Sequence, residues 1–102
     1  MSPSYEEESQ RLARLPRAER FESLIDFPTS HSVKIIGKAE GLALAVKEAL
    51  ADLGYKDMVL IERPSAKGKY LSLTLTIEAQ NGEELDRVYS ALERLPNLSY
   101  LL

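Results

Sequence analysis

The stretch Tyr70-Leu71-Ser72-Leu73-Thr74-Leu75-Thr76-Ile77 alternates polar and apolar side chains without a break. Successive side chains of a β-strand point to opposite faces, so this pattern predicts a strand whose leucines and isoleucine are buried. Its outward side chains are then Tyr70, Ser72, Thr74 and Thr76. A strand with one buried face requires neighbouring strands and a second layer over its apolar side.

The segments before it supply a strand and a helix. Residues 32–37 predict a strand that ends at Gly37. Its two faces carry Val33 with Ile35, and Lys34 with Ile36. Apolar residues then recur at helical spacing, which predicts a helix over about residues 40–53 that Gly54 ends. The buried stripe of this helix is Leu42, Val46, Ala49, Leu50 and Leu53.

The remaining segments predict two strands and a second helix. Residues 55–63, with the apolar run 58–61, predict a strand. Asn81 and the acidic residues after it predict a helix start, because a side-chain oxygen caps the first turn and carboxylates favour its dipole. The buried stripe of this helix is Leu85, Val88, Tyr89, Leu92 and Leu95. A turn at Pro96-Asn97 leads to a last strand over residues 98–102.

The resulting order is strand, helix, strand, strand, helix, strand, as in ferredoxin-like folds. Each crossover skips one strand and should be right-handed. We therefore expect an α+β two-layer sandwich, β-α-β-β-α-β, with an antiparallel sheet of order 4-1-3-2 and both helices on one face. The open face would present Lys34 and Ile36 beside the outward residues of 70–76. It is apolar enough to contact a partner or a second copy of the chain.

The first part of the chain differs in character from the rest. We interpret residues 1–23 as a charged, partly helical extension and residues 24–102 as the ferredoxin-like domain. Ser4 and Glu7 have the spacing of a capping box. An apolar stripe of Phe21, Leu24 and Ile25 predicts a short helix that could dock on the domain as a flap.

The composition describes one small domain and excludes several chemistries. With 102 residues, 44% of them hydrophobic, the chain can bury one two-layer core. It has no cysteine and a single histidine, His31, which excludes disulfides, thiolate chemistry and cysteine-based zinc sites. We expect no metal and no other cofactor.

The charge pattern bears on location and partners. No apolar run approaches the ~20 residues of a membrane span, and the amino terminus is acidic, unlike a signal peptide. We therefore expect a cytoplasmic protein without membrane contact. The net charge of −3, from 13 Lys and Arg against 16 Asp and Glu, disfavours nucleic acid as a partner, because such binding depends on phosphate neutralisation.

The predicted topology gathers cations at one end of the sheet. The loop after the first strand, the hairpin between the second and third strands and the turn at 96–97 all fall there. The cations are Lys38, Arg63, Lys67 and Lys69. They would surround backbone amides of residues 37–41 and 65–68, where a small anionic ligand or an acidic protein surface could bind. The alternative is a solvated hairpin tip whose lysines keep a sheet edge soluble.

The candidate binding residues are Lys34, Gly37, Lys38, Arg63, Ser65, Lys67, Gly68, Lys69 and Tyr70. Lys34 has an alternative role, in which its stem covers apolar surface and its head stays in water. We interpret His31 as a surface or edge histidine rather than a ligand or base. We predict no catalytic residues.

Two other functions stay open at this point. RNA-recognition modules share this element order, but they stack bases on aromatic side chains. Here Lys69, Leu71 and Lys34 hold the corresponding positions. Single-stranded RNA binding is therefore an alternative that has only Tyr70 for stacking. A small phosphate-ester hydrolase is a weaker alternative, supported by Arg63 alone.

The segment Arg63-Pro64-Ser65-Ala66-Lys67-Gly68-Lys69-Tyr70-Leu71-Ser72, with Phe27-Pro28-Thr29 and Lys34-Ile35-Ile36-Gly37 before it, resembles the YbeD-like family of small bacterial proteins. The resemblance covers about residues 24–102 and implies a ferredoxin-like fold akin to ACT regulatory domains. It also implies a regulatory role, near lipoate metabolism. We therefore expect a non-enzymatic regulatory or interaction module, which would act through a population shift in a partner enzyme.

Overall fold

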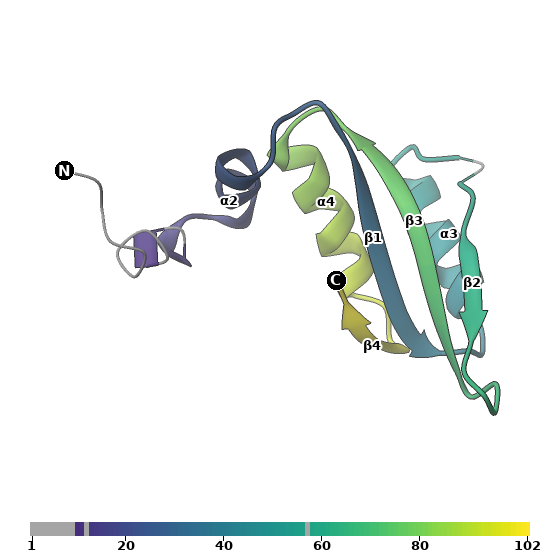
Figure 1. Cartoon of the computed structure of the whole chain (residues 1–102). Helices are drawn as coiled ribbons and strands as arrows, with labels where there is room; N and C mark the ends of the chain where they lie inside the picture. The colour runs from purple at the N-terminus through teal and green to yellow at the C-terminus, as the bar shows by residue number, and fades with distance from the viewer. Residues whose placement is uncertain (1–9, 12, 57) are drawn as a thin grey trace.

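A computed structural model describes residues 10, 11, 13–56 and 58–102. Its elements are α2 (Arg17–Leu24), β1 (Thr29–Lys38), α3 (Leu42–Asp52), β2 (Ile61–Pro64), β3 (Tyr70–Ala79), α4 (Gly82–Glu93) and β4 (Leu98–Leu101). The strands form one antiparallel sheet in the order β2-β3-β1-β4, and α3 and α4 cover one of its faces (Figure 1). The predicted α+β class and the strand order 4-1-3-2 are confirmed. The capping box expected at Ser4 and Glu7 lies outside the described residues.

The core lies between the sheet and the two helices. β3 alternates as predicted, with its leucines and isoleucine buried. They meet Val33 and Ile35 of β1 and the apolar stripes of both helices. Burying a side chain of this size stabilises the fold by about 1.5–3 kcal/mol, so this alternation fixes which face the helices cover.

β1 is longer than the sequence pattern indicated. It begins at Thr29 rather than residue 32, and it continues through Gly37 to Lys38. The expected end at Gly37 is wrong because β3 pairs with β1 along its whole length, from Thr29 opposite Ala79 to Lys38 opposite Tyr70. The glycine instead marks a register shift in the pairing of β1 with β4.

β2 is shorter than predicted and lies later in the chain. The strand expected over residues 55–63 is limited to Ile61–Pro64, and its four residues are all exposed at the sheet edge. Met58 and Leu60, which precede it, pack against the core from irregular backbone. Burial therefore accounts for Met58 and Leu60 of the apolar run, whereas Val59 and Ile61 are exposed.

Both predicted core helices are present. In α3, Leu42, Val46 and Leu50 are buried, but Leu53 follows the helix and is 37% exposed, which corrects its place in the stripe. In α4, the Asn81 side chain caps the first turn by accepting a hydrogen bond from the Glu84 amide, 2.8 Å. The α4 stripe is buried at Leu85, Val88 and Leu92 and partly buried at Tyr89. Leu95 follows the helix, which corrects its place in the stripe, but it still packs against the core.

The amino-terminal helix α2 packs against α4 (Figure 1). Phe21 and Ile25 contact the core from this side, whereas Leu24 is 67% exposed, so the predicted stripe is wrong at that residue. No helix in the described residues has the length and apolar character that a membrane crossing requires.

Candidate functional site

Three loops meet at the end of the sheet where β1 and β2 finish and β3 and β4 begin. The Lys38 amide donates to the Asn97 carbonyl, 3.0 Å, and the Ala39 amide donates to the Lys69 carbonyl, 2.9 Å. The Asn97 side-chain amide donates to the Glu40 carbonyl, 3.0 Å. These bonds join the loop after β1, the β2–β3 hairpin and the turn before β4 into one structure, as the topology predicted.

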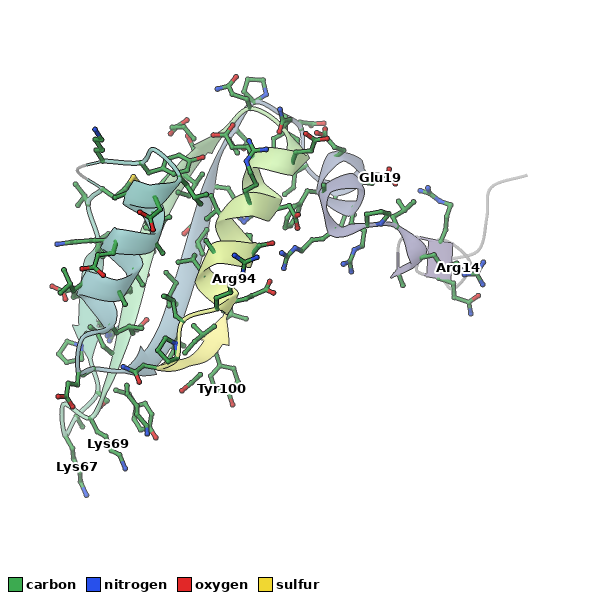
Figure 2. The ribbon with its side chains drawn as sticks, turned by 180° about the vertical axis from the view of Figure 1, so that it is seen from behind. Arg14, Glu19, Lys67, Lys69, Arg94 and Tyr100 are labelled. Carbon is green, nitrogen blue, oxygen red and sulfur yellow. The ribbon has the colours of Figure 1, made fainter. Side chains whose placement is uncertain are left out.

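Four cations lie at this end of the sheet: Lys38, Arg63, Lys67 and Lys69. We call the region that these four residues form the cationic end. Figure 2 shows Lys67 and Lys69 projecting from the hairpin tip, away from the body of the molecule. Two acidic residues, Glu40 and Glu62, lie in the same segments, so four cations and two acids leave a local charge of +2. The four cations are exposed.

These cations differ from Arg17, whose guanidinium is paired with Asp86 and Glu93. Within residues 10, 11, 13–56 and 58–102, the four cations of the cationic end form no ion pair. The Lys69 ammonium lies 5.8 Å from the centre of the Tyr70 ring, a cation–π distance. The positive charge at this end is therefore directed to solvent.

Some of the backbone amides expected to lie beside an anion there are used by the loops themselves. The Ser65 amide donates to the Tyr70 carbonyl and the Gly68 amide donates to the Ser65 carbonyl, both at 2.9 Å. The Ser65 hydroxyl accepts from the Tyr70 amide, 3.1 Å. The Lys38 and Ala39 amides are engaged as well, so these four amides donate within the protein. Ser65 and Gly68 shape the hairpin, and side chains carry the charge.

Lys34 lies apart from the other candidates. It occupies the middle of β1, where its amide donates to the Leu102 carbonyl, 3.0 Å. Lys38 is four positions further along β1, about 13 Å away. The Lys34 side chain is exposed on the open face of the sheet, as predicted. Gly37, in contrast, is buried at the cationic end, where it allows the Asn97 carbonyl to approach β1.

The open face carries a row of four residues that crosses all the strands. Ile36 is paired with Tyr100 of β4 on one side and with Ser72 of β3 on the other, and Ser72 is paired with Arg63 of β2. Tyr100 is 66% exposed and projects below β4 in Figure 2. A hollow of about 480 Å³ is lined by Ile36, Tyr70, Ser99 and Tyr100.

Sequence reasoning missed Tyr100 as a residue of the open face. Strict alternation over residues 98–102 places it on the same side as Leu98, toward the core. The register shift between Ile36 and Gly37 inserts an irregularity, so that Leu98 and Leu101 both contact the core while Tyr100 faces outward. In the sequence, the indication of this irregular pairing is Gly37, which permits the close approach of β4.

A second polar cluster joins the end of α3 to the start of α4. The Tyr55 hydroxyl donates to Glu84 Oε1, 2.5 Å, and Glu84 Oε2 accepts from the Gln80 amide, 3.0 Å. Burial, with the hydrogen bond to Glu84, raises the pKa of Tyr55 to about 12. The same hydrogen bond, with that of Gln80, lowers the pKa of Glu84. Because Glu84 holds two segments together, we assign this cluster a structural role.

His31 also lies in a packed cluster. Its Nε2 is 3.1 Å from the Tyr89 hydroxyl, and its ring is 6.5 Å from that of Phe21. It is partly buried at the start of β1, beneath α2. No group of three or more His, Cys, Asp or Glu side chains suited to a metal ion occurs in the described part of the chain.

Comparison with known proteins places the chain among bacterial relatives. A family model described as "Protein of unknown function (DUF493)" matches residues 22–102. A UPF0250 protein from Nitrosomonas europaea is 38% identical over 84 residues, which are 79% of this chain and 97% of the relative. A UPF0250 protein from Bordetella pertussis is 37% identical over 84 residues, 79% of this chain and 92% of the relative. These matches confirm the resemblance to the YbeD-like family.

Two solved structures share the fold. The solution structure of protein HP0495 from H. pylori has a TM-score of 0.67 at 17% identity, covering 100% of this chain and 96% of that one. The ACT domain from GTP pyrophosphokinase of Chlorobium tepidum has a TM-score of 0.54 at 15% identity, covering 72% of this chain and 97% of the domain. At these identities the likeness concerns the fold alone.

Proposed function

The chain belongs to the DUF493 family of proteins of unknown function, and from that premise we propose that it is a non-enzymatic binding module whose cationic end contacts an acidic protein surface or a small anionic ligand. The observation that carries the proposal is a set of exposed cations that form no ion pair in the described part of the chain. They lie at the end of β1 and on the β2–β3 hairpin, which a hydrogen bond between Ala39 and Lys69 ties together. Complementary charge favours rapid and selective association with an acidic partner.

The loops give this charge a defined position. A flexible lysine on a mobile tip loses conformational entropy when it binds, whereas a fixed backbone reduces that cost. The Ala39 amide is hydrogen-bonded to the Lys69 carbonyl, so the end of β1 and the β2–β3 hairpin keep a fixed separation. We propose that the module acts in the cytoplasm by binding one state of a partner enzyme and so shifting its population.

The test is a charge reversal at the hairpin tip. The double variant Lys67→Glu and Lys69→Glu should fold normally, since both side chains are exposed, and lose the proteins that the natural chain captures from its native lysate. Lys47→Glu with Lys56→Glu is the matched control, because it makes the same change in net charge at exposed residues outside the cationic end. Captured proteins are identified by mass spectrometry, and their affinity is then measured by titration.

Two results would contradict the proposal. Equal affinity of the natural chain and the hairpin double variant would remove the cationic end as the contact region. Turnover of a generic chromogenic phosphate ester that disappears in Arg63→Ala would instead favour the hydrolase alternative. We expect no such turnover.

A further inference from the structure

The centre of the open face is apolar and its surroundings are polar or cationic. Ile36 has Lys34 and Lys38 on either side of it along β1, and it has Tyr100 and Ser72 as its partners on the neighbouring strands. An apolar floor within a polar rim is the arrangement typical of small-molecule sites. The floor is shallow, because the core beneath it is filled.

Two tyrosine rings border this floor. Tyr70 is 40% exposed and Tyr100 is 66% exposed, and the hollow of about 480 Å³ includes both of them with Ile36 between. The two rings make no aromatic contact with each other in the described structure, so neither ring is covered by the other. Exposed aromatic rings that share a hollow favour stacking of a planar group.

Positive charge continues from the hollow toward β2. A second hollow of about 230 Å³ shares Ile36 and Tyr70 with the first and extends to Arg63. Lys38 is paired directly with Tyr70, and the Lys69 ammonium is 5.8 Å from its ring centre. An anionic group attached to a stacked ring would therefore meet three cations.

The acidic side chain that the β3 register places on this face lies far from the hollow. Glu78 is eight residues from Tyr70 along β3, and its carboxylate accepts a hydrogen bond from Ser30, 2.5 Å. Eight residues of strand correspond to about 26 Å. Glu40 and Glu62 lie at the same end of the molecule as the hollow but line neither hollow, whereas Arg63 lines one of them.

We propose that the open face binds a small planar aromatic anion, with the ring over Ile36 between Tyr70 and Tyr100 and the anionic group on Lys38, Arg63 and Lys69. This inference deepens the proposed binding function by naming a ligand class and by adding Ile36 and Tyr100 to the site. A mononucleotide has the required chemistry, since it joins a planar base to a phosphate.

Two other occupants fit the face less well. A second copy of the chain, face to face, would bring equal cations together around the same floor. A long single strand of RNA would need a continuous basic track, whereas the chain has a net charge of −3 and its two bordering rings enclose a single hollow.

The experiment is an NMR titration of the full chain with AMP, adenosine and ribose 5-phosphate. We expect AMP to shift the amide signals of Ile36, Tyr70 and Tyr100. Adenosine, which lacks the phosphate, and ribose 5-phosphate, which lacks the base, should each bind more weakly than AMP. Equal binding of AMP and ribose 5-phosphate would overturn the role of the rings, and equal binding of AMP and adenosine would overturn the role of the cations.

Variants separate the two halves of the site. Tyr100→Ala should weaken AMP binding about fivefold or more, the loss that one aromatic ring causes in base stacking, whereas Tyr100→Phe should keep the affinity. Arg63→Gln should weaken AMP and leave adenosine unchanged. Leu44→Ala is the control, because Leu44 is 62% exposed on α3, in the helical layer.

The remaining outcomes also decide the question. The proposal is wrong if AMP shifts no signals on this face, if an RNA oligonucleotide binds there while AMP does not, or if face signals change with protein concentration alone, which would indicate self-association. Lys67→Glu distinguishes this proposal from the preceding one, since it should reduce partner capture and leave AMP binding intact. If the natural chain captures a partner but does not bind AMP, the ligand proposal has failed. If it binds AMP but captures no partner, the proposed partner binding has failed.

Discussion

Gly37 lies where β1 passes closest to the turn before β4. A Cβ atom at this residue would collide with the Asn97 carbonyl oxygen and would lie 3.3 Å from the Leu98 Cα atom. The same carbonyl accepts the Lys38 amide, so it cannot move away without losing that bond. At this residue the absence of a side chain, and not a special backbone angle, is what the fold requires.

Gly37→Ala should therefore destabilise the protein. Overpacking against backbone typically costs about 1–3 kcal/mol, because the neighbouring strand must shift. Urea unfolding followed by circular dichroism measures the change in the free energy of unfolding. Ser99→Ala, an exposed change on β4 close by, should alter it by less than about 0.5 kcal/mol. An unchanged midpoint for Gly37→Ala would show that β4 can move aside freely.

At the scale of elements, α2 is held on α4 by a small set of specific contacts. Arg17 Nε donates to Asp86 Oδ1, 2.5 Å, its guanidinium also donates to Ser90 Oγ, 2.8 Å, and it pairs with Glu93. The Glu22 carboxylate accepts from the Gly82 amide, 2.6 Å, at the first turn of α4.

Apolar contacts reinforce this docking. The Phe21 ring is 5.5 Å from that of Tyr89, and the Arg17 guanidinium lies 5.7 Å from the centre of the same tyrosine ring. A Cβ atom on Gly82 would collide with the Ala18 carbonyl oxygen, so the glycine allows the two helices to approach closely. The sequence-based expectation of a flap that docks on the domain agrees with this arrangement.

We predict that Arg17→Ala loosens α2 without unfolding the domain. Its ion pairs are partly exposed, and such pairs contribute at most about 1 kcal/mol each. Loss of the side chain also removes its packing on Tyr89. Hydrogen exchange should become several-fold faster in residues 17–24 and stay the same in β1 and β3. Arg94→Ala, an exposed arginine at the end of α4, serves as control. Equal exchange in both variants would mean that the apolar contacts and the Glu22–Gly82 hydrogen bond hold α2 without Arg17.

At the scale of the whole molecule, the cationic end and the Tyr55–Glu84 cluster lie at opposite ends of β3. The cationic end lies at the start of β3, whereas the Tyr55–Glu84 cluster lies beyond its other end, at the start of α4. The ionisable groups whose pKa values shift in the described structure are Tyr55, Glu84 and Tyr89, all of them in contact with α4 or part of it. Titration of these groups therefore affects folding more directly than it affects the cationic end.

Global stability should depend on pH through the Tyr55–Glu84 pair. The folded pKa of Tyr55, about 12, exceeds its unfolded value of 10.0, so its contribution is complete below pH 10 and is lost as pH rises toward 12. The folded pKa of Glu84 lies below its unfolded value of 4.5, so its contribution is complete above pH 4.5 and is lost as pH falls further.

Tyr55→Phe tests this linkage. Urea unfolding at intervals between pH 7 and pH 12 should show a smaller loss of stability above pH 10 in the variant than in the natural chain. Tyr100→Phe removes a phenol from the open face and is the matched control. If Tyr55→Phe and the natural chain lose stability in parallel, the tyrosine does not contribute to the alkaline slope.

Sequence patterns were sufficient to predict the fold to the level of strand order. The unbroken alternation of residues 70–77 set one buried face, the cap at Asn81 set the start of α4, and right-handed crossovers then left one arrangement of the strands. These features are local or follow from general rules of chain connection. The gathering of Lys38 with the hairpin cations followed from the same topology.

The details of the candidate sites depend instead on contacts between segments that are distant in the sequence. Hydrogen bonds among the three loops use the Lys38 and Ala39 amides, which sequence reasoning had placed beside a ligand. Their acceptors are distant in the sequence, since Ala39 and Lys69 are 30 residues apart and Lys38 and Asn97 are 59 residues apart. The irregular pairing at Gly37 turned Tyr100 outward and so placed a second ring beside Ile36. A regular periodicity describes a strand that is paired uniformly, whereas these outcomes depend on where distant backbone groups meet.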